Sequence, residues 1–396
     1  MSVDTPLTLL GGLTAHEFMR DYWQRKPLLI RQAIPGFRHS LSIADIRELV
    51  RRDEVESRLI WRDGQGWHMK QGPFSRLPAR SRPDWTVLAQ SVDLHDDATA
   101  ELLHQFRFIA DARVDDAMIS VAGDGGGVGP HFDSYDVFLL QAAGKRRWRI
   151  SRQSDLTLQP GLPLKILRHF VPEDDYILEP GDMLYLPPHV AHDGVALGEC
   201  MTISIGFRAP SLATLACGML EAANDLVMAN AGDTGGLYAN PVIPGPDLNA
   251  RYSDPDAGAT DRPARLPEGM IKAALHAVRQ VQFTPTLAAR FLGQWLTEPS
   301  PSALFEPDDT PLHWHAPLES TVQIKLDRCT RMLYRDKALF INGEVADAAP
   351  GRLMKALADE RSLTLTPRLA EQLTDTEKNC LERWQEDGWL HTGDTA

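Results

Sequence analysis

Short apolar runs separated by glycine and proline fill residues 117–208, and this texture differs from the sequence on either side. Runs rich in β-branched and aromatic residues favour strands, and short strands at close spacing are typical of a barrel or jelly roll. We therefore expect an all-β core made of five strand-like segments, AMISVA, DVFLLQA, RRWRI, MLYLP and MTISIGF.

The sequence before this core predicts two helices and a strand. Residues 14–24 have helical spacing, with Thr14 as the N-cap and Glu17 at the capping-box position. Residues 26–31 have the apolar run of a strand. Residues 42–53 again have the spacing of a helix with one apolar face.

The sequence after the core is helical at first and mixed at its end. Helical spacing predicts three helices, at residues 211–229, 269–281 and 285–297. Residues 230–268 are rich in Gly, Pro and Asp and predict a loop, and residues 298–312 predict a linker. The last part mixes strand-like and helical segments, which suggests a small winged-helix-like domain. The predicted fold class is mixed α/β (α+β), with domains at residues 1–208, 209–300 and 313–396.

Composition narrows the class of protein. The 396 residues are 43% hydrophobic and 24% charged, as in ordinary soluble domains. No apolar run approaches the roughly 20 residues of a membrane span, and the N-terminus lacks the pattern of a secretory signal. Four scattered cysteines without a CxxC pair argue against a disulfide framework or a thiolate zinc site. We expect a cytoplasmic protein with no membrane association.

The formal net charge of −13 bears on the partners. Nonspecific nucleic-acid binding relies on Lys and Arg that neutralise phosphates, so we expect no direct nucleic-acid binding. A basic partner would be attracted by the long-range field. The acidic balance is equally explained by solubility alone.

The triplet His131-Phe132-Asp133 places an imidazole and a carboxylate two residues apart. In a strand such residues point to the same face. Two histidines and one carboxylate that leave metal positions open are typical of non-haem Fe(II) oxygenases. The triplet alone is a weak signal, because a histidine in a turn and an aspartate at a strand edge are both common.

A second element could supply the other histidine. Pro180-Gly181-Asp182 predicts a turn, a strand follows, and two prolines predict another turn before His189 and His192. Both histidines follow the second turn, and spacing cannot choose between them.

Two neighbouring features fit a metal site. Residues 123–129 are glycine-rich without the GK[ST] of a P-loop, which favours close backbone approach, although a mobile loop is an alternative. After Gly144, alternation places Arg146 on the face of Trp148 and Ile150. If that face is buried, Arg146 needs an anion, and a dicarboxylate cosubstrate would supply one. The alternative is a solvated basic strand.

Together these motifs resemble the bacterial JmjC/cupin-type ribosomal oxygenases (the RoxA/YcfD type). The matching segments are GPHFDSYDVFLLQAAGKRRWRI, LEPGDMLYLPPHVAHDG and SIGFRAP, with YWQRKPLLIR and YSDPD in support. The resemblance implies a double-stranded β-helix with an N-terminal extension, a helical dimerisation region and a C-terminal winged-helix-like domain, hence a homodimer. Such enzymes use Fe(II), 2-oxoglutarate and O₂. They hydroxylate the β-carbon (C3) of an arginine in a large-subunit ribosomal protein, the sixteenth of that subunit.

The resemblance also implies residue roles. The implied metal ligands are His131, Asp133 and His192. His189 stands where a small residue is expected. Arg146 would bind 2-oxoglutarate, and Ser120 would be a second position of the same pocket.

Two polar residues are weaker candidates for substrate contacts. Tyr135 shares the alternation face of Asp133, although core packing explains it equally well. Ser204 lies on a predicted core strand.

Three other functions remain open at this point. One is a JmjC lysine demethylase, which shares the iron chemistry but acts on N-methyl groups. Another is a nonenzymatic winged-helix adaptor with a vestigial cupin. The third is a metal-dependent cupin isomerase or small-ligand binder.

Overall fold

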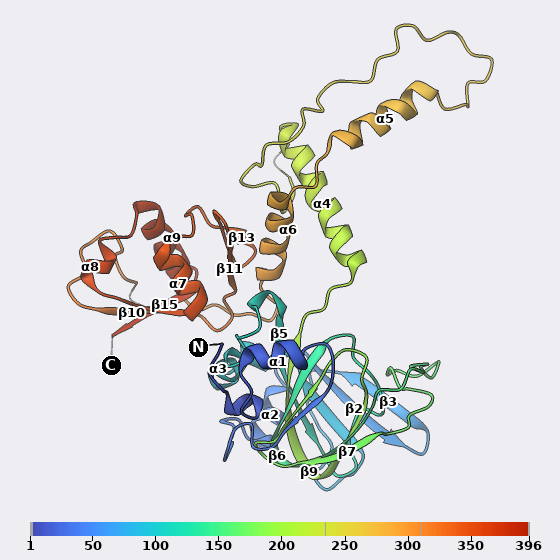
Figure 1. Cartoon of the computed structure of the whole chain (residues 1–396), viewed down its shortest axis with the longest axis vertical. Helices are drawn as coiled ribbons and strands as arrows, with labels where there is room; N and C mark the ends of the chain where they lie inside the picture. The colour runs from blue at the N-terminus through green and yellow to red at the C-terminus, as the bar shows by residue number, and fades with distance from the viewer. Residues whose placement is uncertain (1–2, 234, 310, 395–396) are drawn as a thin grey trace. The chain divides into compact units, whose positions relative to one another are not determined.

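The computed structural model describes residues 3–233, 235–309 and 311–394. The chain forms two compact units (Figure 1). The first is Met1–Ala209 with Pro301–Leu304, and the second is Pro210–Ser300 with Phe305–Ala396. The three domain ranges expected from the sequence stay a prediction.

The first unit begins with α1 (Ala15–Asp21), β1 (Leu28–Ile30) and α2 (Ile43–Leu49). The capping box of α1 is confirmed: the Glu17 N–H donates to the Thr14 hydroxyl at 3.1 Å, and the Thr14 N–H donates to the Glu17 carboxylate at 2.8 Å. Both helices end earlier than predicted, because the chain turns at Tyr22 and again after Val50.

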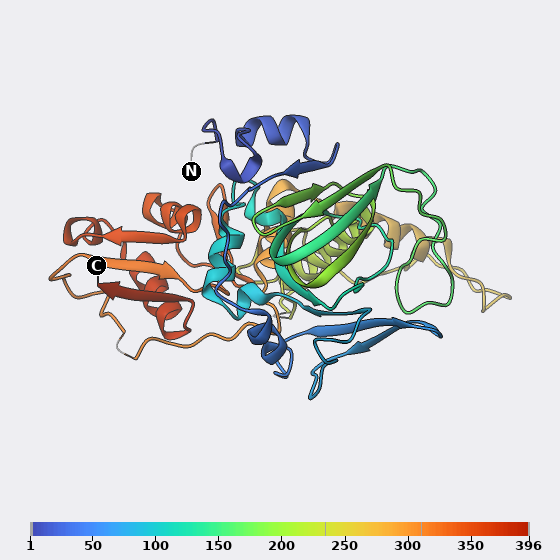
Figure 2. The ribbon, with the colours of Figure 1, turned by 90° about the horizontal axis from the view of Figure 1, so that it is seen from below.

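One antiparallel sheet dominates the described part of this unit. Its further strands are β2 (Ser57–Asp63), β3 (Gly66–Gln71), β4 (Trp85–Ala89), β5 (Val114–Ala122), β6 (Asp136–Ser151), β7 (Asp174–Leu178), β8 (Met183–Leu186) and β9 (Ala191–Phe207), with α3 (Asp97–His104) between β4 and β5. Its order is β1-β8-β6-β9-β5-β4-β2-β3, and β7 also pairs with β6. In Figure 2 the turquoise to green strands curl around, while β2 and β3, in blue, extend to one side.

The longest strands join segments that the sequence pattern separates. DVFLLQA and RRWRI are two parts of β6, which continues through irregular pairing with β9 near Gln141, Ala143 and Lys145. MTISIGF is the end of β9, whose first residues include His192. The predicted all-β core is confirmed, but two predicted segments merge into the single strand β6, and β7 was not predicted.

Aromatic rings fill the core beneath β6. Phe18 of α1 lies with its ring centroid 5.4 Å from that of Phe138 and 4.9 Å from that of Tyr185, and all three are fully buried. Burial of such rings contributes about 2–3 kcal/mol each. The N-terminal extension is therefore part of the core that positions the start of β6.

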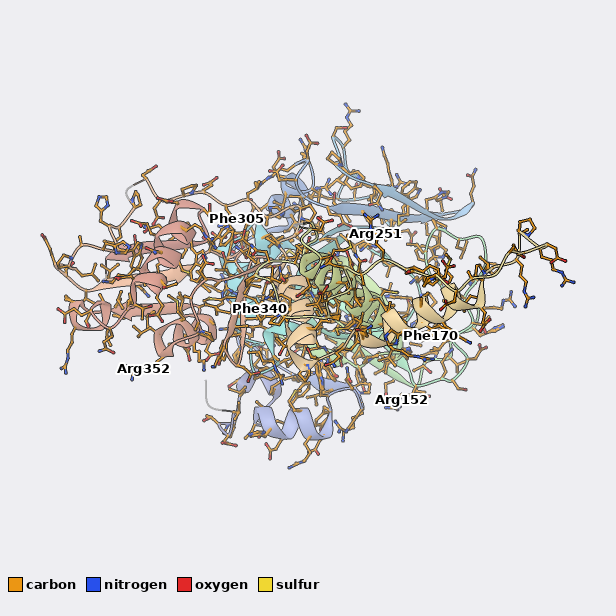
Figure 3. All side chains as sticks on the ribbon, turned by 90° about the horizontal axis from the view of Figure 1, so that it is seen from above. Arg152, Phe170, Arg251, Phe305, Phe340 and Arg352 are labelled. Carbon is orange, nitrogen blue, oxygen red and sulfur yellow. The ribbon has the colours of Figure 1, made fainter. Side chains whose placement is uncertain are left out.

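The second unit contains the predicted helices α4 (Leu212–Asn230), α5 (Glu268–Gln280) and α6 (Pro285–Thr297). Its remaining elements are β10 (Val322–Leu326), β11 (Met332–Arg335), β12 (Ala338–Ile341), β13 (Glu344–Val345), α7 (Arg352–Glu360), β14 (Ser362–Leu365), α8 (Pro367–Ala370), α9 (Asp375–Glu386) and β15 (Leu390–Asp394). Gly293 of α6 leaves room for Phe340 of β12, labelled in Figure 3, since a Cβ there would lie 2.4 Å from the ring. The mixed α/β fold class is confirmed. Apart from the helix ends at Asn230 and Glu268, the predicted loop and linker have no helix or strand among their described residues. Positions 234 and 310 lie outside the described residues.

Among the described residues, α4 is long and apolar enough to cross a membrane, by length and composition only. No apolar run of that length was expected from the sequence. Core helices meet the same test. Its buried face, which includes Ala222 and Leu226, packs with Phe291 of α6.

Candidate metal centre

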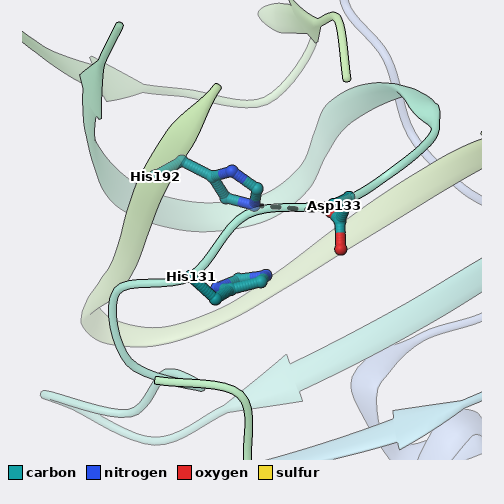
Figure 4. A group of neighbouring side chains, drawn as sticks. All are labelled: His131, Asp133 and His192. Atoms are coloured by element: carbon teal, nitrogen blue, oxygen red, sulfur yellow. Dashed lines mark ion pairs between the residues drawn. The ribbon is translucent and has the colours of Figure 1, made fainter. Parts of the chain in front are cut away.

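Three predicted ligands converge where β6 and β9 begin. One ligand atom from each of His131, Asp133 and His192 lies within 4.8 Å of the others, and the side chains point toward one another (Figure 4). His192 Nε2 lies 3.6 Å from Asp133 Oδ2, and the two imidazole centroids are 4.2 Å apart. Two imidazoles and a carboxylate at this spacing can hold one divalent metal ion.

The backbone explains this convergence, although the expectation that the HxD triplet lies within a strand is wrong. His131 pairs with His192 through one isolated bridge, with N–H···O distances of 2.9 and 2.8 Å. Asp133 lies in the irregular segment just before β6. The bridge places His131 directly opposite His192.

Each histidine is oriented by a backbone carbonyl. His131 Nδ1 donates to Gly129 O and His192 Nδ1 donates to Val190 O, both at 2.9 Å. Each imidazole therefore presents Nε2 to the site, the usual arrangement of metal-binding histidines. Burial and the neighbouring His131 lower the pKa of His192, against the opposing effect of Asp133, so this ring is held in its neutral form.

His189 does not join this group. It adopts a left-handed conformation with φ +67°, and its side chain is exposed. Its N–H donates to Asp133 O at 2.8 Å, and its ring lies 5.8 Å from that of Phe132. A left-handed turn favours glycine, which fits the small residue implied by the resemblance.

Arg146 is a buried cation with unused donors. Arg146 is 5% exposed. The next residue, Arg147, is exposed and pairs with Asp175, so the two arginines lie on opposite faces of β6 as alternation predicts. Arg146 Nη1 donates to Ser120 Oγ at 3.4 Å. Among the described residues, its Nε and Nη2 are buried without a partner. A buried guanidinium in this state calls for an anion, so the site fits the far carboxylate of 2-oxoglutarate.

The glycine-rich segment is explained by close backbone approach. A Cβ on Gly126 would lie 2.1 Å from Trp85 O, and one on Gly127 would lie 2.5 Å from Gly194 O. Gly194 itself leaves room for the ring of Trp148. Side chains at these positions would push apart the strands that carry the site.

Two carboxylates near the site were not anticipated from the sequence. Burial and Asp115 raise the pKa of Asp116 to about 6, and Asp116 accepts the Ser91 N–H at 2.9 Å. Burial, Asp133 and Asp116 raise the pKa of Tyr135, which is 40% exposed. The adjacent pair Asp115-Asp116 at the start of a core strand was the available signal.

The second is Asp136, the first residue of β6 and fully buried. It accepts hydrogen bonds from Tyr185 Oη at 2.6 Å and from Gln24 Nε2 at 2.9 Å, and Arg113 lies 3.3 Å away. No local pattern could have revealed these partners, because they come from distant parts of the chain. Ser204 is 8% exposed and pairs with Leu139 across β6 and β9.

The curled antiparallel sheet, the converging His-Asp-His group and the anion-seeking arginine define the class of JmjC metal oxygenases. Comparison with known families agrees: a JmjC domain matches residues 101–215, and a ROXA-like winged helix matches residues 277–391.

Similar proteins narrow this class. The chain is 32% identical over 358 residues to the ribosomal protein uL16 3-hydroxylase of Escherichia coli, which covers 88% of this chain and 89% of the relative. It is 37% identical over 215 residues to a probable ribosomal oxygenase of Haemophilus influenzae, 52% of each chain. The solved structure of E. coli YcfD has a TM-score of 0.77 at 28% identity, over 96% of this chain and 98% of that one. A YcfD structure with cobalt and 2-oxoglutarate has a TM-score of 0.74 at 28% identity, over 96% and 99% of the two chains.

This chain belongs to the ribosomal oxygenase family of JmjC proteins. It is an Fe(II)- and 2-oxoglutarate-dependent oxygenase, and its own residues fit both groups.

Proposed function

We propose that this enzyme hydroxylates the β-carbon (C3) of an arginine in the sixteenth protein of the large ribosomal subunit. The observation that carries the proposal is the similarity to the E. coli uL16 3-hydroxylase along nearly the whole chain. The JmjC and winged-helix matches lie in the same order along the chain as the predicted domains.

Each site residue has a proposed task. Iron is held by His131, Asp133 and His192, and when bound it supplies the oxidising chemistry with 2-oxoglutarate and O₂. Arg146 fixes the far carboxylate of 2-oxoglutarate, with Ser120 beside it. Trp148 lies beside both groups, with its ring centroid 5.9 Å from that of His192 and 5.6 Å from the Arg146 guanidinium, and its proposed task is to limit water there.

The substrate guanidinium is proposed to lie near Tyr135 and Asp116. Tyr135 offers a partly exposed ring face beside the metal group, and an arginine stacks well on such a face. Asp116 is a partly buried carboxylate with a raised pKa, so a cationic ligand would restore its ordinary ionisation. Ser204 is a further proposed polar contact.

The direct test is intact-mass analysis of ribosomal proteins from cells with and without this protein. We expect one large-subunit protein to gain the mass of one oxygen, and the gain to disappear when His131→Ala replaces the wild type. Peptide fragmentation should place the oxygen on an arginine. Loss of a methylene mass from a methylated lysine would instead identify a demethylase.

The biochemical control separates the substrate from the chemistry. Iron-dependent conversion of 2-oxoglutarate to succinate without any ribosomal product would contradict the substrate assignment but leave the oxygenase intact. No succinate at all would favour the vestigial adaptor.

A homodimer is also proposed, through the helical region. No residue of α5 is buried, and Ile271, Leu275 and Val278 form an exposed apolar row along it. Leu220 of α4 is 60% exposed. Light scattering should give twice the chain mass for the wild type and the chain mass for Leu275→Asp, with Leu197→Asp on β9 as the control. As a modifier of ribosomal proteins, the enzyme is proposed to be cytoplasmic, which cell fractionation would test.

A further inference from the structure

The charge of this chain is unevenly distributed. Residues 38–82 carry ten Lys and Arg against six Asp and Glu, whereas the whole chain carries 41 against 54. This basic stretch includes α2 and the segment that leads to β4. The net charge of −13 therefore does not describe the surface around α2.

Two adjoining hollows lie on this surface and together form what we call the α2 groove. One has a volume of about 570 Å³ and the other about 230 Å³, and they share Ala44 and Arg80. Four arginines line the two hollows, and Glu48 is the acidic residue among the described lining residues; the arginines are Arg38, Arg47, Arg51 and Arg80. The three metal-site residues do not line either hollow.

Arg47 is fixed in place but lacks a full set of partners. Its Nη2 donates to Pro78 O at 2.8 Å, and its guanidinium lies 5.3 Å from the centroid of the Trp85 ring. Its Nη1 is buried without a partner among the described residues. Burial lowers the pKa of Arg47, and so do the neighbouring cations Arg80 and Arg51, against the effect of Glu199. An anion in the groove would accept a hydrogen bond from Arg47 Nη1 and would offset the lowering of the Arg47 pKa.

The other arginines are neutralised to different degrees. Arg80 makes a bidentate pair with Glu199, whose side chain is only 18% exposed, so this cation is largely neutralised. Arg51 pairs with Glu48 at 3.3 Å through side chains that are 51% and 74% exposed. An exposed single contact such as Arg51–Glu48 is weak and exchanges readily for another anion. The groove therefore has cationic side chains available for phosphate.

The larger hollow adds an apolar and aromatic floor. Phe37, Ile43 and Met201 line it, and the rings of Phe37 and His39 are 6.1 Å apart. Arginines along a groove that also offers an aromatic ring are the features by which proteins bind single-stranded nucleic acid, with phosphates on the cations and a base on the ring. A small free anion would not contact these apolar and aromatic residues, so the larger hollow favours a ligand that carries a base.

We propose that the α2 groove binds single-stranded RNA. Arg47 and Arg51 contact phosphates, and a base packs on Phe37. The choice of RNA among polyanions rests on the proposed ribosomal substrate, but binding is measured without hydroxylation, so the two proposals can fail separately. The inference replaces the expectation of no nucleic-acid binding, which followed from the charge of the whole chain.

The test is fluorescence anisotropy of a labelled single-stranded RNA dodecamer titrated with full-length protein at several salt concentrations. We expect binding in the range of about 1–100 µM that weakens as salt rises. Polyglutamate serves as an unlabelled competitor that carries charge without bases, and inorganic phosphate as a competitor without a chain. RNA should compete better than either.

Three variants locate the surface. Arg51→Gln should reduce the slope of log affinity against log salt by about 0.7, the value for one phosphate contact of a single strand. Phe37→Ala should weaken binding at least about fivefold through lost stacking. Arg47→Gln should also weaken binding, and because it loses the contact to Pro78 as well, Arg51→Gln decides if that variant does not fold.

Arg152→Gln is the matched control, since Arg152 is likewise exposed and paired with acidic residues; it is labelled in Figure 3. It should bind RNA as the wild type does, and every variant should still convert 2-oxoglutarate to succinate. No anisotropy change up to about 100 µM protein would overturn the proposal. Equal losses in Arg51→Gln and Arg152→Gln would overturn the location, and stronger competition by polyglutamate would replace RNA with an acidic peptide.

Discussion

Each compact unit contains a cluster of histidine and aspartate. The two clusters contain the same residue types, but one can bind a metal ion and the other cannot. In the metal centre, His131 and His192 give Nδ1–H to backbone carbonyls and present Nε2 to the site. In the second unit, His391 bonds through Nδ1 to Asp308 at 2.7 Å and through Nε2 to Asp327 at 3.1 Å. Neither nitrogen of His391 is left for a metal.

The pKa values of His192 and His391 shift in opposite directions because their neighbours differ. Burial and a neighbouring imidazole lower the pKa of His192. Burial also acts to lower the pKa of His391, but hydrogen bonds to Asp308 and Asp327 outweigh it and raise the pKa overall. The comparison teaches that a His-Asp cluster becomes a metal site only when its hydrogen bonds leave nitrogen lone pairs directed at one point. Four predictions test it, from the largest effect to the smallest.

The largest effect is expected on metal binding. His192→Gln should lower Co(II) affinity more than about a hundredfold, because loss of even an outer partner of a ligand typically costs 10–100-fold. His391→Gln should leave it unchanged. Isothermal titration with Co(II) measures both, and similar affinities for the two variants would contradict the distinction.

Arg146→Gln should raise the dissociation constant of 2-oxoglutarate about a hundredfold, which corresponds to about 3 kcal/mol for a lost buried ion pair. Titration of the Co(II)-loaded protein measures this. Arg147→Gln, on the opposite face of β6, is the control and should have no effect. Without 2-oxoglutarate, Arg146→Gln should be at least as stable as the wild type, because an unpaired buried charge has been removed.

The His391 cluster should make the second unit sensitive to pH. Because the folded pKa is raised, its stabilising contribution is complete below the ordinary histidine value of about 6.5 and is lost as pH rises through the folded pKa. The melting temperature of the wild type should therefore exceed that of His391→Gln at low pH, and the difference should shrink as the pH rises. A difference that grows with pH would show that the imidazole is neutral in the folded state.

The smallest effect concerns the third histidine. His189→Gly removes a left-handed non-glycine residue but adds chain entropy to the unfolded state, so the free energy of unfolding should change by less than about 1 kcal/mol. Co(II) affinity should not change, since His189 contributes only a backbone N–H to Asp133. Chemical denaturation and the same Co(II) titration measure the two quantities. A large loss of metal affinity would make His189 a ligand.

The sequence allowed much of this to be predicted, where the signal is local. Alternation placed Arg146 on the face of Trp148, which the structure shows to be buried, and capping residues placed the starts of α1 and α2. The choice of His192 over His189 needed the resemblance, because it depends on a left-handed turn that spacing does not encode. The partners of Asp136 could not be predicted, since they come from the turn after α1, from β8 and from the residue just before β5. The two-residue strand β13 has too few residues to show a pattern.

The buried position of Asp136 has a practical consequence for anyone who would isolate the catalytic part. A fragment cut to the JmjC match, residues 101–215, would keep all three metal-site residues yet lose Gln24, the rings of Phe18 and Trp23, and the strand β1 that pairs with β8. It would expose one edge of β8 and leave a carboxylate short of a partner beneath the site. The smallest piece of this chain worth expressing for catalysis therefore begins before α1, well upstream of the boundary that the domain match suggests.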